Sequence, residues 1–162
     1  MESLTTLKRN LEGSMEKPKH VYQIWIRTTP ERLWDAITKP DETVRYFFGT
    51  EVQTDWQPGS PIVYAWEGKH ELDGRIVEVD PPRKLVTTFL MTHDETAKND
   101  PPSRVTWLIE RNGDMCKLTV IHDDFHEETA TFRSVDNGWP YILSGLKTWI
   151  ETGTTLPGMT KD

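Results

Sequence analysis

One short segment of the chain carries the residue types that bind metal ions. Two histidines four residues apart would share a face on a helix, and a neighbouring carboxylate would complete a metal site. The segment instead follows an alternating apolar pattern and runs into a loop, where the two rings need not converge. We therefore predict a solvated acidic edge and no metal site. The segment is IHDDFHEE, with His122, Asp123, Asp124, His126 and Glu127 as its candidate ligands.

Catalytic signatures are weak throughout the chain. The sequence has no Gly-x-Ser-x-Gly elbow, no phosphate-binding glycine loop and no dinucleotide fingerprint. Four polar residues on or between predicted strands would supply acid–base chemistry if they entered a cavity. Polar residues of this kind ordinarily lie on the exposed side of a strand. We therefore assign no catalytic residue and predict no cofactor. The four are Glu67, His70, Arg75 and Glu78.

Composition and charge narrow the classes of partner. The 162 residues include 26 acidic and 19 basic side chains, a formal net charge of −7. Nucleic-acid binding needs clustered Lys and Arg, which are scattered here, so we predict no nucleic-acid partner. No window approaches the roughly 20 apolar residues of a spanning helix, and the N-terminus lacks the apolar core of a secretory signal. With Cys116 as the single cysteine, these features predict a cytoplasmic protein without membrane insertion.

Aromatic residues give the strongest functional signal. Small-molecule pockets are mostly apolar, but the same rings would also fill a core, and both interpretations stay open for each residue alone. As a group we predict a cavity wall. Tyr46, Phe47 and Phe48 follow two short predicted helices at the expected cavity mouth, where they form a gate or anchor the helices. The predicted wall consists of Tyr64, Trp66, Phe89, Trp107, Trp139, Leu143 and Trp149.

A C-terminal helix must position several of these rings. Between Gly138 and Gly153, apolar residues recur at steps of three and four, which predicts one apolar helical face. Gly138 precedes this predicted helix, and Gly153 suits its left-handed C-cap. The preceding region, 123–135, is predicted to be an acidic loop.

The rest of the chain predicts a curved antiparallel sheet. Thr29-Pro30-Glu31 indicates a helix start after a first strand, and Pro40 ends that helix before a second short one over 41–46. About six alternating strands then follow, separated by turns. Strands with helices gathered on one side define an α+β domain. We divide the chain into a flexible or weakly helical extension over 1–19, with Met15 a candidate start, a domain over 20–153 and a tail over 154–162.

Several motifs in this order resemble a known superfamily. Over residues 20–153 the chain resembles the START and birch-pollen-allergen superfamily, also called SRPBCC or helix-grip. Within it, the chain resembles the branch homologous to the C-terminal domain of the activator of the heat-shock chaperone ATPase. Such a fold hosts many activities, so the resemblance specifies structure better than function. The matching segments are 24–34 (IWIRTTPERLW), 55–60 (DWQPGS), 74–85 (GRIVEVDPPRKL), 103–107 (SRVTW) and 138–153.

The resemblance implies a deep cavity between the sheet and the last helix. Relatives use it for lipids, sterols, plant hormones and polyketides, so the first hypothesis is non-catalytic binding of a hydrophobic small molecule of lipid, polyketide or aromatic type. An enzyme of the cyclase, aromatase or hydrolase kind would use the same cavity. A chaperone-activating relative would instead contact its chaperone through the domain surface. An exposed strand edge and surface aromatics are consistent with a homodimer.

Overall fold

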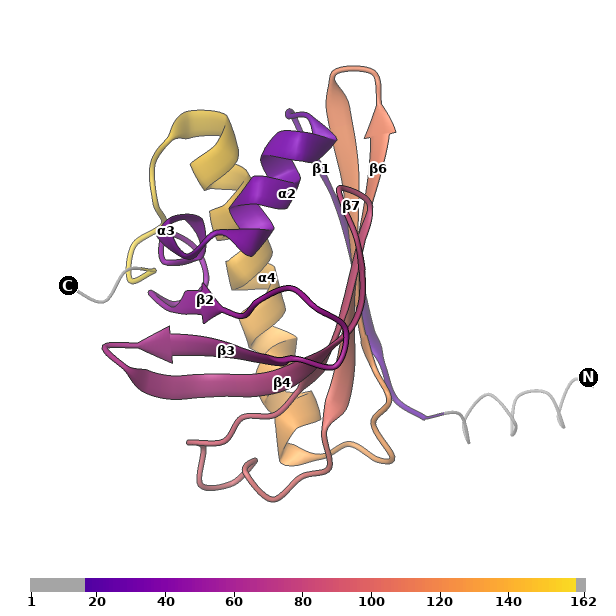
Figure 1. Ribbon diagram of the computed structural model, residues 1–162, viewed down its shortest axis with the longest axis vertical. Coiled ribbons are helices and arrows are strands. Elements are labelled where there is room, and N and C mark those ends of the chain that lie inside the picture. Colours follow the sequence, from indigo (N-terminus) through magenta and orange to yellow (C-terminus); the bar gives the residue numbers. More distant parts are fainter. Residues whose placement is uncertain (1–16, 160–162) are drawn as a thin grey trace, which may run out of the picture.

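A single antiparallel sheet wraps around a long helix in the computed structural model, which describes residues 17–159 (Figure 1). Within those residues the seven strands lie in the order β1-β7-β6-β5-β4-β3-β2. The predicted α+β helix-grip fold is therefore confirmed. The elements are β1 (His20–Ile26), α2 (Pro30–Thr38), α3 (Pro40–Thr43), β2 (Glu51–Gln53), β3 (Pro61–Trp66), β4 (Lys69–Asp80), β5 (Lys84–Phe89), β6 (Ser103–Asn112), β7 (Met115–Asp123) and α4 (Ala130–Thr152).

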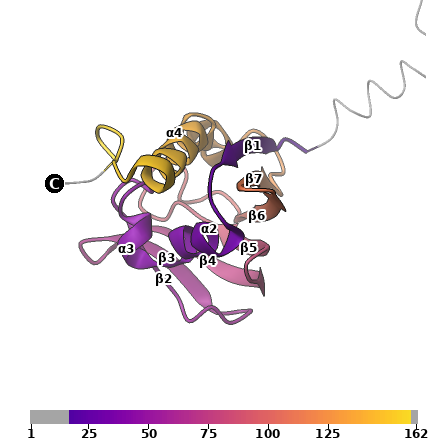
Figure 2. The same cartoon turned by 90° about the horizontal axis from the view of Figure 1, so that it is seen from above.

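The sheet bends sharply in the middle of the chain. The pairing register shifts between Tyr64 and Ala65 in β3 and between Ile76 and Glu78 in β4, and such bulges bend strands and increase their twist. Beside the second shift, β4 and β5 approach so closely that a Cβ on Gly74 would lie 2.1 Å from the Thr88 carbonyl oxygen. Seen from above, the sheet curves around an interior closed by α4 (Figure 2).

The short helices after β1 begin where the sequence predicts. The Thr29 side chain accepts a hydrogen bond from the Arg32 N–H at 3.1 Å, and Pro30 occupies the first turn of α2. Pro40 separates the two helices and opens α3, which ends at Thr43 and is shorter than predicted. The Tyr46 hydroxyl donates to the Ala36 carbonyl oxygen at 2.8 Å, which ties the end of this segment back to α2.

Helix α4 begins nine residues earlier than predicted, so the expectation of a loop over 123–135 is wrong from residue 130 onward, and also at Asp123, the last residue of β7. Thr129 caps the helix by accepting from the Phe132 N–H at 3.1 Å, and Asp100 from the loop between β5 and β6 accepts from the Thr131 N–H at 2.9 Å. These caps extend the helix through Gly138 and Pro140, because tertiary contacts outweigh the low helix propensity of both residues. The predicted C-cap is confirmed: Gly153 has φ 75°.

The segment after α4 packs back onto the domain. Met159 is fully buried against Gly145 of α4, and the Tyr141 hydroxyl donates to the Pro157 carbonyl oxygen. The predicted N-terminal extension, including the candidate start at Met15, lies largely outside the described residues. None of the helices within residues 17–159 is long and apolar enough to span a membrane.

Candidate functional site

A cavity of about 480 Å³ lies between the N-terminal half of α4 and the bent part of the sheet. Its walls come from segments far apart in the sequence. Helix α4 contributes Val135, Trp139 and Ile142 among others, and the 44–50 connection contributes Phe47 and Phe48. Leu72 of β4, Phe89 of β5 and Met91 complete the apolar lining.

A much smaller inner chamber of about 10 Å³ adjoins this cavity. Four side chains border both spaces: Phe47, Leu72, Phe89 and Trp139. Trp107 and other residues of β3 to β6 line the inner chamber. A space of this size holds about one water-sized group.

A buried hydrogen-bond network holds Trp139 in place between the two spaces. The Trp139 indole N–H donates to Nδ1 of His122 at 2.9 Å, and Nε2 of His122 lies 2.7 Å from the Ser103 hydroxyl oxygen. The Ser103 hydroxyl in turn donates to the Phe89 carbonyl oxygen at 3.4 Å. Both His122 and Ser103 are buried, so the network joins α4 to three strands of the sheet inside the core.

The direction of these hydrogen bonds fixes the proton on His122. An indole nitrogen can only donate, so Nδ1 accepts and the proton of the neutral ring sits on Nε2. That proton points at Ser103, which leaves Nε2 unable to take a proton from the serine hydroxyl as a general base would. Burial, with a smaller contribution from His20, lowers the pKa of His122 to about 3. The Ser103–His122 pair is therefore a structural lock and does not generate a nucleophile.

Four of the seven residues predicted to form the cavity wall border these spaces. Phe89 and Trp139 line both, while Tyr64 and Trp107 line the inner chamber. Tyr64 stacks on Phe47 at 4.5 Å between ring centroids, and Trp107 meets Trp139 edge to face at 5.4 Å. The fold therefore places these four residues around two adjoining spaces, and their role as a ligand-binding wall stays a prediction.

The other three predicted wall residues lie elsewhere. Leu143 is buried in the core beyond the cavity lining. Trp66, at the end of β3, is half-buried with the Lys69 ammonium 6.0 Å from its ring centroid. Trp149 donates its indole N–H to Glu42 of α3 at 2.9 Å. Burial alone would raise the pKa of Glu42, but hydrogen bonds from Trp149 and Arg32 outweigh it and lower that pKa.

The three residues predicted as a gate divide between two roles. Phe47 and Phe48 line the cavity, and Phe48 stacks on Tyr141 of α4 with 5.9 Å between ring centroids. Tyr46 is buried outside the lining and anchors the segment through its bond to Ala36. Tyr46 therefore matches the anchoring interpretation, while a gate formed by Phe47 and Phe48 stays a prediction.

Sequence reasoning missed the polar pair at the cavity rim. The His93 Nε2 contacts the Glu71 carboxylate, and its Nδ1 lies 3.0 Å from the Glu71 carbonyl oxygen. Glu71 has a side chain 16% exposed, whereas that of His93 is 54% exposed, so the carboxylate is the inner member of the pair. His93 sits in a polar loop with no strand or helix pattern, so nothing in the sequence pointed to this contact.

The predicted solvated acidic edge is wrong for His122, which is fully buried. His126 remains at the surface beside Glu127, with 3.2 Å between its Nε2 and the carboxylate. Among residues 17–159, no three His, Cys, Asp or Glu side chains gather to hold a metal ion. The four polar residues on or between strands are exposed to solvent, as expected. They are Glu67, His70, Arg75 and Glu78.

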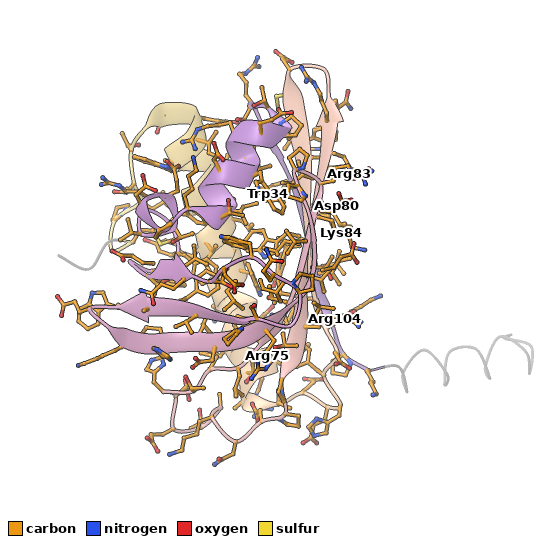
Figure 3. All side chains as sticks on the ribbon, in the orientation of Figure 1. Trp34, Arg75, Asp80, Arg83, Lys84 and Arg104 are labelled. Carbon is orange, nitrogen blue, oxygen red and sulfur yellow. The ribbon has the colours of Figure 1, made fainter. Side chains whose placement is uncertain are left out.

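Charged side chains line the face of the sheet turned away from α4 (Figure 3). They pair with each other: the Arg83 guanidinium contacts Asp80, and Arg104 contacts Asp123 at 3.0 Å. The outer face of the sheet therefore carries these ion pairs, while the aromatic cavity lies on the inner face.

The family model of the Activator of Hsp90 ATPase homolog 1-like proteins matches residues 27–151. The chain belongs to this family. The match spans the interval from the end of β1 almost to the end of α4, which is the part of the chain that builds the cavity. A comparison with curated proteins found no match.

Solved structures with the same fold share little sequence with the chain. The Aha1 dimer from Colwellia psychrerythraea is 18% identical, with 84% of this chain and 98% of that chain covered and a TM-score of 0.68. An HSP90 activator from Plasmodium falciparum is 19% identical, with coverage of 83% and 96% and a TM-score of 0.67. DynU16, from the dynemicin biosynthetic locus, is 15% identical, with coverage of 86% and 49% and a TM-score of 0.71. At these identities the comparisons show the fold alone.

Proposed function

We propose that this protein binds a hydrophobic small molecule, of lipid, polyketide or aromatic type, in the cavity between the sheet and α4. The observation that carries the proposal is the volume of about 480 Å³ together with a wall of aromatic and aliphatic side chains. Pockets for small molecules are commonly about 300–1,000 Å³ and mostly apolar. Burial of apolar ligand surface contributes roughly 25 cal/mol per Å² before the entropic costs of binding.

The rim suggests how a ligand enters. Phe48 and Tyr141, from different segments, stack on each other at the cavity, and Glu71 with His93 adds a polar edge to its lining. A ligand that passes between these groups would reach Trp139 at the base of the cavity. The rigid lock on Trp139 keeps that surface pre-formed, which lowers the ordering cost of binding.

Gly138 offers a direct test, because it lines the cavity and an added Cβ would meet nothing within 4 Å. The probe is N-phenyl-1-naphthylamine, whose fluorescence increases in apolar surroundings. Gly138→Leu should place its side chain in the cavity and reduce the fluorescence increase, whereas Gly138→Ala should retain it. Equal probe binding by the wild type and a folded Gly138→Leu variant would refute the assignment. Native mass spectrometry of freshly purified protein then identifies any co-purifying ligand class.

A second candidate function is contact with a chaperone of the Hsp90 class. Its support is the family description and two exposed apolar side chains of β1, Val21 at 50% and Trp25 at 45%. The test is the ATPase rate of a purified Hsp90-class chaperone with and without this protein. A rate increase lost in Trp25→Ala would favour this function, and an unchanged rate would exclude it for that chaperone. Analytical ultracentrifugation of the same samples tests the expected homodimer.

A further inference from the structure

Three polar groups in the inner chamber have no hydrogen-bond partner among residues 17–159. They are the Tyr64 hydroxyl, the Thr87 hydroxyl and the Trp107 indole N–H, and all three residues line the chamber. Their exposed fractions are 9%, 6% and 2%, so each is at least nine-tenths buried. Buried polar groups without a partner are rare, because leaving one unpaired costs about 1–3 kcal/mol.

The three groups face open space inside the protein. Every side-chain nitrogen or oxygen of the described residues that is sealed from a water-sized probe has a partner. Since these three atoms have none, each must reach space that a water-sized group can occupy. The inner chamber is the space that their residues share.

The other polar side chains around the chamber are already occupied. Asp73 accepts from the Thr92 hydroxyl and contacts His70 at 3.0 Å, and the Thr88 hydroxyl accepts from the Arg75 N–H at 2.8 Å. The three groups without a hydrogen-bond partner come from three different strands, β3, β5 and β6. All three can donate: burial raises the pKa of Tyr64, so its hydroxyl keeps its proton.

We infer that the inner chamber receives one acceptor oxygen, of the carbonyl type, carried by the otherwise apolar ligand and held by Tyr64, Thr87 and Trp107. The chamber has room for about one such atom, and its volume is about 10 Å³. The ring system of the ligand lies in the larger cavity, beside Phe89 and Trp139, which border both spaces. This inference rests on the proposed binding function and adds the chemical class of the ligand: an aromatic or polycyclic ketone, quinone or related compound.

A matched pair of probes tests this inference. Fluorene and 9-fluorenone have the same rigid ring system and differ by one carbonyl oxygen. We expect equilibrium dialysis to show that the wild-type protein prefers 9-fluorenone. Tyr64→Phe and Thr87→Val should each lower the ratio of the two affinities by about 2- to 10-fold, the value of one hydrogen bond. Fluorene affinity should stay unchanged, because both variants keep the apolar shape of the wall.

Tyr46→Phe is the matched control, since its hydroxyl bonds to Ala36 outside both chambers. This variant should lose stability but keep the wild-type affinity ratio. Binding of both probes with a ratio unaffected by Tyr64→Phe and Thr87→Val would overturn this inference and leave the cavity function standing. Failure of both probes to bind would overturn the cavity function and this inference together. A crystal structure with the 9-fluorenone oxygen about 3 Å from Tyr64 Oη would support the inference directly, and an oxygen at the rim would refute it.

Discussion

The two halves of helix α4 carry one apolar stripe but meet different surroundings. In the N-terminal half, Val135, Trp139 and Ile142 face a cavity of about 480 Å³. In the C-terminal half, Leu146 is fully buried and Trp149 bonds to Glu42 of α3. Helical periodicity cannot distinguish these halves, because it specifies which side of a helix is covered and says nothing about how tightly.

Two glycines on this helix show the difference most clearly. A Cβ added at Gly138 would meet nothing within 4 Å, whereas at Gly145 it would lie 2.9 Å from Met159 Cε and 3.3 Å from Tyr46 Cβ. Gly145 therefore permits close packing of the tail and the 44–50 connection. Gly138 preserves an opening. The same residue type serves opposite purposes seven positions apart.

Replacing each tryptophan of α4 should give the largest effects. Trp139→Ala should lower the free energy of unfolding by about 3–5 kcal/mol, because it removes a buried ring and leaves Nδ1 of His122 without its donor. Trp149→Ala should cost about 2 kcal/mol, since that ring is half-buried and loses one hydrogen bond to a carboxylate. Urea unfolding measures both. Similar losses of unfolding free energy in the two variants would contradict this prediction, because both halves of α4 would then depend equally on their tryptophans.

The two glycines give the next largest contrast. Gly145→Leu should destabilise the protein by about 2 kcal/mol, because the new side chain collides with a filled region. Gly138→Leu should stabilise it by roughly 0.5–1 kcal/mol, because leucine favours the helix and enters open space. Thermal unfolding of both variants checks the sign. Destabilisation by Gly138→Leu would show that the cavity is closed in solution.

Lowering the pH should reduce the free energy of unfolding, because His122 is buried in its neutral form beside the cavity. In the unfolded chain this residue titrates near its ordinary pKa of about 6.5, whereas the folded value is about 3. Between these pH values the unfolded state binds more protons, so the His122 contribution is complete above pH 6.5 and is lost as pH falls toward 3. The slope should approach about 1.4 kcal/mol per pH unit at most.

The measurement is the free energy of unfolding in urea at several pH values between 7 and 4. His122→Gln provides the control, because an amide can accept from Trp139 and donate to Ser103 without titrating. That variant should be less stable at neutral pH but should show a flatter dependence in this window. An equal slope in both proteins would assign the acid sensitivity to other groups.

The smallest effect belongs to Tyr141, which stacks on Phe48 at the cavity and bonds to Pro157 of the tail. Tyr141→Phe keeps the ring and removes an exposed hydrogen bond, so it should cost about 0.5 kcal/mol. Binding of N-phenyl-1-naphthylamine should not change. Loss of probe binding in this variant would mean that the tail controls the cavity mouth.

The sequence predicted the elements around the site better than the roles of individual side chains. The Thr29 cap, the Gly153 cap and the family were all recognisable, because they depend on local patterns. The early start of α4 was missed, since Gly138 and Pro140 suggested a helix boundary while Asp100, about 30 residues away, supplies part of the true N-terminal capping. His122 was grouped with its acidic neighbours, although its partners Trp139 and Ser103 lie 17 and 19 residues away.

By itself, the sequence determined an antiparallel sheet, a long amphipathic helix and a set of aromatic rings directed between them. Alternation and helical periodicity carry that information, because they reflect which side of each element avoids water. The tertiary structure alone decided which rings enclose space and which fill it. That choice depends on the close approach of β4 and β5 at Gly74, on the position of Met159 against Gly145 and on the hydrogen bonds of His122. Each of these brings together residues far apart in the chain, at distances that no local pattern records.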